Sequence, residues 1–143
     1  MMFVAMEGTV KFNEESNFLK VVDELYQQKH INDEGFFIDK QGVPISPDEF
    51  PNVDTEMLCI SVPYFLYQDL SPKSLFGEGG KGVIIAASND GCFNGWLFSD
   101  GDEHNYDLYQ WASENFHVRK PEGDDAELNE WQHEVIAMFM DDV

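Results

Sequence analysis

The feature that most constrains the fold of this chain is its charge. Its 143 residues include 28 aspartates and glutamates but only eight lysines and arginines, a formal net charge of −20. Self-repulsion of this kind opposes compaction. The chain is nevertheless 43% hydrophobic and has twelve phenylalanines, whereas disordered acidic chains have few aromatic residues. We therefore expect a folded domain with an ordinary core and with its carboxylates on the surface.

The length fits a single domain, residues 1–143, because domains most often hold about 100–150 residues. Residues 1–6 are apolar but lack the basic start of a signal peptide. We expect them to be disordered or to precede a true start at Met6. Cys59 and Cys92 are too few for a disulfide framework, and their apolar neighbours predict buried free thiols. A reducing, cytoplasmic location is the resulting expectation.

The spacing of apolar residues and turn formers predicts an α+β domain with a mainly antiparallel sheet. A first helix is expected over residues 14–29, with Asn13 as its N-cap. About five strands are expected, at residues 35–38, 43–45, 57–62, 83–87 and 95–98. The glycines of residues 77–82 and the acidic residues 99–103 are expected in loops. A second helix is expected at residues 106–116.

The last helix, expected over residues 124–140, carries much of the charge. Helical geometry places one apolar arc on it, made of Leu128, Trp131, Val135, Met138 and Phe139. The opposite side holds Glu127, Glu130, Glu134 and Asp141. Residues 90–143 have a net charge of −12 and residues 1–89 a net charge of −8, so the acidity is concentrated in the C-terminal third.

We predict no catalytic site, no metal and no cofactor. The glycine-rich residues 77–82 lack both the Ser or Thr and the following helix of a P-loop. Asp100, Asp102 and His104 alternate as calcium ligands do, but the glycine and the glutamate that an EF-hand requires are missing. The four histidines have no zinc-binding spacing.

The charge also restricts the partners. Nucleic acid and anionic lipid are bound through clusters of Lys and Arg, which this sequence lacks, and no apolar run approaches the roughly 18 residues of a membrane span. A basic protein is the favoured partner. The candidate partner-binding residues are Asp100, Asp102, Glu103, Tyr106, Asp107, Tyr109, Glu127, Glu130 and Glu134. The two tyrosines have an equal alternative role, which is to cover the sheet, and the oligomeric state is not indicated.

The stretch from Gly95 to Glu103 resembles the Gly-Trp-x-Phe…Gly-Asp-Glu signature of some bacterial toxin-immunity proteins. This resemblance implies a small acidic cytoplasmic protein that binds and blocks a basic toxin, often a nuclease, and it transfers no inhibitory residue to this chain. Three other functions stay open. They are a nucleic-acid mimic of the phage type that antagonises a DNA-binding enzyme, an enzyme or ligand-binding domain whose site is not visible in the sequence, and acidity that reflects adaptation to salt.

Overall fold

The computed structural model describes residues 3–46, 50–63, 65–68, 70–88, 91–99, 102–116 and 130–142. Within these ranges the chain forms one seven-stranded antiparallel sheet and four helices, which confirms the predicted α+β class. The strands are β1 (Phe3–Phe12), β2 (Val53–Asp54), β3 (Cys59–Val62), β4 (Phe65–Gln68), β5 (Gly80–Ser88), β6 (Phe93–Ser99) and β7 (Asp102–Asp107). The helices are α1 (Glu15–Gln27), α2 (Pro72–Phe76), α3 (Leu108–Phe116) and α4 (Glu130–Asp142).

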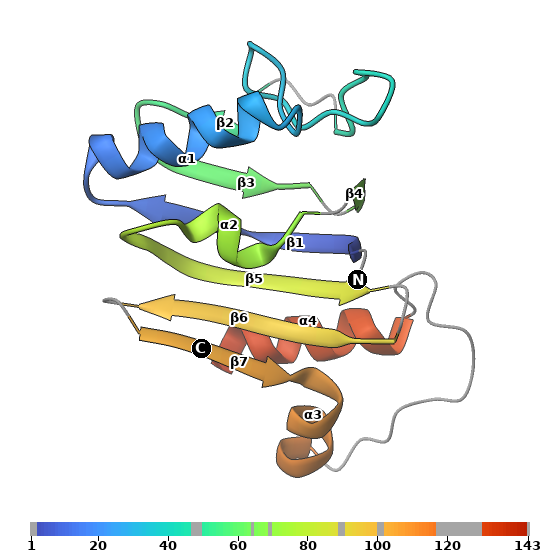
Figure 1. Cartoon of the computed structure of the whole chain (residues 1–143). Coiled ribbons are helices and arrows are strands. Elements are labelled where there is room, and N and C mark those ends of the chain that lie inside the picture. The colour runs from blue at the N-terminus through green and yellow to red at the C-terminus, as the bar shows by residue number, and fades with distance from the viewer. Residues whose placement is uncertain are drawn as a thin grey trace.

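The sheet is built around the two longest strands, β1 and β5, which lie side by side. Its spatial order is β2-β3-β1-β5-β6-β7, and β4 also pairs with β1 (Figure 1). The register places Gly8 opposite Ile84 and Val10 opposite Gly82. Strands β2 and β7 therefore form the two edges of the sheet.

The helices cover opposite faces of the two halves of this sheet. Helices α1 and α2 lie on one face, and α4 lies on the other, behind β6 and β7 in the view of Figure 1. Strand β5 contributes to both sides, because Ile84 and Ala86 belong to one core cluster and Ile85 and Ala87 to the other. Successive side chains of a strand point to opposite faces, so one apolar strand serves both layers.

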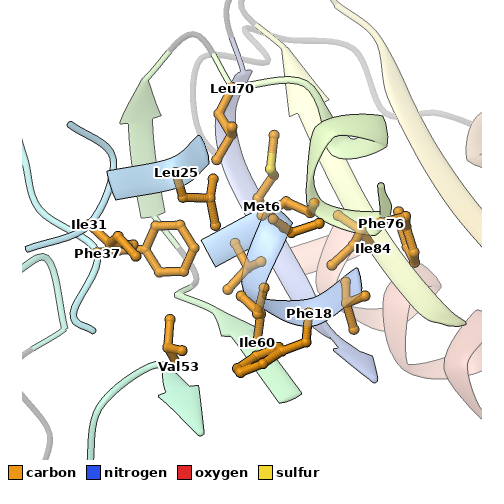
Figure 2. Packing of buried hydrophobic residues seen from close by; sticks show 14 of the residues in the cluster. Met6, Phe18, Leu25, Ile31, Phe37, Val53, Ile60, Leu70, Phe76 and Ile84 are labelled. Atoms are coloured by element: carbon orange, nitrogen blue, oxygen red, sulfur yellow. The ribbon is translucent and has the colours of Figure 1, made fainter. Parts of the chain in front are cut away.

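The first core cluster fills the space between α1, α2 and strands β1, β3 and β5 (Figure 2). Phe18, Val21 and Leu25 of α1 are buried at helical spacing and face the sheet. Ile31 and Phe37, from the connection that follows α1, lie beside Leu25 and are also buried. The long segment between α1 and β2 is thus anchored by its own apolar side chains.

The second core cluster joins α3 and α4 to β5 and β6. Val135 and Phe139 of α4 are fully buried, which confirms the inward face predicted for these two residues. Helix α4 approaches the sheet closely at Gly95, where an added Cβ atom would lie 2.7 Å from Cε1 of Phe139. The absence of a side chain at this position of β6 is what lets the Phe139 ring reach the sheet.

The N-terminal segment differs from the sequence-based expectation of disorder. Residues 3–6, expected to be disordered or to precede the true start, belong to β1, and Met6 is only 1% exposed. Strand β1 was not predicted at all, although it occupies the middle of the sheet. Gly8 in its centre disguises the strand pattern, and it is required there because an added Cβ atom would lie 2.1 Å from the Val83 carbonyl oxygen.

Four expected elements differ in extent from the structure. In place of the strands predicted at 35–38 and 43–45, the structure has two isolated bridges, Ile31–Phe37 and Ile38–Pro44. Pro44 has no N–H group with which to extend the second bridge into a ladder. Two of the glycines predicted in a loop, Gly80 and Gly82, lie in β5 instead. The N-cap of α1 is Glu14 rather than Asn13.

The acidic segment after β6 is also different from the expectation. Ser99 ends β6, and Asp102 to Asp107 form β7, so all of the described residues of the predicted loop lie in strands. The helix predicted from residue 106 begins at Leu108. Cys59 and Cys92 are free thiols as expected, but both are half-buried rather than buried.

Candidate protein-interaction surfaces

The carboxylates of the described chain lie at the surface. Every Asp and Glu whose side-chain exposure is described is exposed, apart from Glu7 and Asp39, which are half-buried. Burying an unpaired carboxylate is strongly unfavourable, so the folded chain keeps these groups in water. Within the described residues, the negative charge is therefore a property of the surface, and the interior is apolar.

Strand β7 presents a row of acids along one edge of the sheet. It pairs with β6 from Ser99–Asp102 to Asn94–Asp107, and no described strand pairs with its other side. Asp102, Glu103 and Asp107 are all exposed. The outward N–H and C=O groups of an edge strand can accept another strand. Asp100, which the sequence analysis grouped with these acids, lies outside the described residues.

Because successive side chains of a strand point to opposite faces, the predicted site residues of β7 lie on both faces of the sheet. Glu103 is on the same face as α2, where its Oε2 atom lies 3.5 Å from Nζ of Lys73. Tyr106 is on the face covered by α4, with its ring 5.4 Å from that of Phe139. Asp102 shares the face of Tyr106, and Asp107 that of Glu103. The structure therefore brings these residues to one edge but not to one face.

Asp107 and Tyr109 also hold the fold together where β7 turns into α3. Oδ1 of Asp107 accepts hydrogen bonds from the backbone N–H groups of Tyr109 (3.0 Å) and Gln110 (3.2 Å), the geometry of an N-cap. The Tyr109 hydroxyl accepts a hydrogen bond of 3.1 Å from Nε2 of the buried Gln132. The side chains of Tyr106 and Tyr109 are both half-buried. They cover the sheet, and a part of each still reaches the surface.

The predicted acidic side of the last helix is described only in part. Glu134 and Asp141 are exposed on α4. Glu130 is the first residue of α4, and Glu127 lies outside the described residues. Tyr106 packs on Phe139, so α4 and Asp102 lie on the same side of the sheet.

A second surface, which sequence reasoning missed, is an apolar groove beside α1. It has a volume of about 510 Å³ and lies between α1 and residues 31–35, and Val53 and Thr55 also line it. Leu19 and Tyr26 line it and are each 48% exposed, and Val22 between them is half-buried. Their spacing of three and four residues places all three on one side of the helix. That spacing was the signal available in the sequence.

The glycine-rich segment does form a cavity, of about 550 Å³, together with the start of α1. Lys73 and Lys81 line it, but so do Glu14, Glu78 and Glu103. A strand follows the glycines, and three carboxylates oppose a phosphate at this place. This arrangement does not favour the binding of a nucleotide phosphate.

Within the described ranges, no three His, Cys, Asp or Glu side chains are grouped so that they could hold a metal ion. None of the helices in this part of the chain combines the length and the apolar character that a membrane crossing requires.

The fold and its surfaces define a small α+β domain with an acidic sheet edge and an apolar groove. Comparison of the chain with protein-family models, with curated proteins and with solved structures finds no match. The function must therefore be argued from the surfaces themselves.

Proposed function

We propose that this protein binds a basic protein partner and that the acidic edge strand β7 is part of the contact, in the manner of an inhibitor or an immunity protein. The observation that carries the proposal is the exposure of Asp102, Glu103 and Asp107 along an edge that no described strand covers. A basic segment of the partner can pair with the outward backbone groups of β7 while its Lys and Arg side chains meet these carboxylates.

The same charges favour a basic partner over a second copy of this chain. Two copies of β7 placed edge to edge would bring like charges together, which is how charged residues protect natural edge strands from self-pairing. Only a strand of opposite charge would gain from both the backbone hydrogen bonds and the side chains. The net charge of −20 further speeds the approach of a basic protein through long-range attraction.

Two features bear on the choice among the alternative functions. The stretch that resembles immunity proteins, residues 95–103, covers most of β6 and the start of β7, so the resemblance falls on one structural unit at the proposed contact. A nucleic-acid mimic requires carboxylates in rows on one face. Glu103 and Asp107 point to one face of the sheet and Asp102 to the other, which weighs against mimicry.

The proposal is tested by affinity purification with the whole protein from its native host at low salt, followed by kinetics with the purified partner. The variant Asp102→Lys/Glu103→Lys reverses two acids of β7. The matched control Glu15→Lys/Glu56→Lys makes the same change in net charge at exposed positions in the other half of the molecule. We expect the β7 variant to slow association about tenfold more than the control does, because steering depends on charges near the contact.

Circular dichroism establishes that both variants are folded. Recovery of no basic protein at low salt would contradict the proposal. Equal association rates for the two variants would show that net charge alone, and not the β7 edge, attracts the partner.

A further inference from the structure

We infer that the groove beside α1 is a second docking site, which takes an apolar side chain of a partner protein flanked by Lys or Arg. Its walls are Leu19, Val22 and Tyr26 on one side and the turn at residues 31–35 on the other. Folded proteins seldom leave neighbouring large apolar side chains uncovered, and such patches mark sites of interaction. The volume of about 510 Å³ is ample for one or two large side chains.

The wall opposite α1 is held in place before any partner arrives. Oδ1 of Asn32 accepts hydrogen bonds of 3.0 Å from the backbone N–H groups of both Glu34 and Phe36. The Gly35 carbonyl accepts a further bond of 3.0 Å from the N–H of Val53, which ties the turn to β2. A wall fixed in this way loses little conformational entropy on binding, so the apolar contacts contribute more fully to the affinity.

The floor of the groove continues the first core cluster. Ile31 and Val53 line the groove and are buried, and Figure 2 shows both beside Phe37 at the margin of that cluster. A side chain that enters the groove would therefore extend the core outward rather than rest on a polar surface. This is the kind of buried anchor on which the affinity of protein interfaces most depends.

Charge identifies the chemistry of the occupant. Asp23, Asp33 and Glu34 line the groove and are exposed, and none of its described lining residues is a lysine or an arginine. Carboxylates around an apolar floor complement a segment that carries one apolar residue between basic ones. A second copy of this chain is disfavoured, because it would bring another acidic surface against the same rim.

This inference rests on the proposed function for the basic character of the partner, but it concerns a different surface. Strand β2, which contributes Val53 to the groove, is at one edge of the sheet and β7 is at the other. The two contacts can therefore be separated by mutation.

The probe is a phage-displayed library of random peptides of about 12 residues, a length that covers one docking motif. The library is selected on the full-length protein. A parallel selection on the Leu19→Ser variant identifies peptides that bind outside the groove. Leu19 is half exposed, so this variant should fold. We expect the enriched peptides to share a Leu, Phe or Trp within a few positions of Lys or Arg.

One enriched peptide is then synthesised with a fluorescent label, and its affinity is measured by anisotropy. We expect Leu19→Ser to weaken binding about tenfold, as loss of an apolar anchor does, and Asp33→Lys/Glu34→Lys to weaken it and to lower its salt dependence. The control Met140→Ser removes an apolar side chain that is 43% exposed on α4, and should leave the affinity unchanged.

Enriched peptides without apolar residues, or equal affinity for the wild type and Leu19→Ser, would overturn the inference. Peptides that bind Leu19→Ser as tightly as the wild type but bind the Asp102→Lys/Glu103→Lys variant weakly would refute the groove as a docking site and leave the proposed function intact. Sedimentation that shows a dimer in the wild type and a monomer in Leu19→Ser would identify the groove as a contact between copies and would also overturn it.

Discussion

Replacing Lys29 by glycine tests the physical reason for the end of α1. The N–H of His30 donates to the Leu25 carbonyl at 2.9 Å and that of Lys29 to the Tyr26 carbonyl at 3.1 Å, the hydrogen bonds of a Schellman motif. Lys29 has φ of 62°, the left-handed conformation for which this motif usually employs glycine. The structure therefore contains a strained lysine at an exposed position.

The magnitude follows from two opposing effects. A Cβ atom in the left-handed region costs about 1–2 kcal/mol, which glycine avoids. The greater freedom of glycine in the unfolded chain opposes folding by about 0.5–1 kcal/mol. Both Lys29→Gly and Lys29→Ala lose the lysine charge, so comparing these two variants cancels its effect on the helix dipole. We expect the glycine variant to be more stable than the alanine variant by about 0.5–1 kcal/mol.

The assay is equilibrium unfolding in urea, monitored by circular dichroism. With a slope of about 2 kcal/mol per molar urea for a domain of this size, the midpoints should differ by about 0.3–0.5 M at equal slope. An alanine variant more stable than the glycine variant by about 0.5–1 kcal/mol would refute the reasoning, because only the entropy cost of glycine would then remain and the backbone strain at residue 29 would have no energetic effect.

Two further variants probe the packing of the C-terminal half. Gly95→Ala should destabilise the protein by about 1–3 kcal/mol in urea unfolding, because the new Cβ would lie 2.7 Å from Cε1 of Phe139. In a Phe139→Leu background the same change should cost much less. Additive effects of the two changes would contradict the contact between residue 95 and the Phe139 ring. Asp107→Ala should cost about 1 kcal/mol through loss of the α3 cap, whereas Asp107→Asn, which keeps a capping oxygen, should stay close to the wild type. Equal losses in the two Asp107 variants would assign the effect to charge instead of capping.

The parts of the fold that the sequence predicted are those with strong local signals. Helix α1 was located by the spacing of Phe18, Val21 and Leu25, and β5 by its apolar run. Strand β1 was not predicted, because its short apolar start resembles an N-terminal tail and Gly8 interrupts the apolar pattern of a strand. Its place in the middle of the sheet depends on pairing with β3 and β5, which are distant in sequence, and local patterns do not report such contacts.

Strand β7 was missed for a related reason. Its sequence, Asp102 to Asp107, is rich in residues that disfavour strands, and its side chains are mostly exposed. It is a strand because β6 beside it offers a complete row of hydrogen-bonding groups. Pairing with a neighbour outweighs local propensity here, and that neighbour lies across the hairpin. The acidic residues were therefore identified from the sequence, but their position on a sheet edge was not.

The α1 groove shows the opposite case, in which the local signal was present but incomplete. Leu19, Val22 and Tyr26 form a second apolar row on a helix whose core row is Phe18, Val21 and Leu25. A wide apolar face is ambiguous, since the outer row can be covered by the protein's own chain or left open. The turn at residues 31–35 stops short of covering it, and that outcome depends on the hydrogen bonds of Asn32.

The two edges of the sheet show why the acids of β7 call for more than a structural explanation. Strand β2 has two residues, too few to offer a template for pairing, and its Val53 is bonded to the turn after α1. The short length of β2 and this hydrogen bond protect that edge. Strand β7 has six residues and no described strand outside it, so charge is its means of excluding copies of itself. A shorter β7 would have served equally well if exclusion were the only requirement. A long, open and acidic edge excludes the same chain and accepts a basic one, and this selectivity is what the charge-reversal experiment measures.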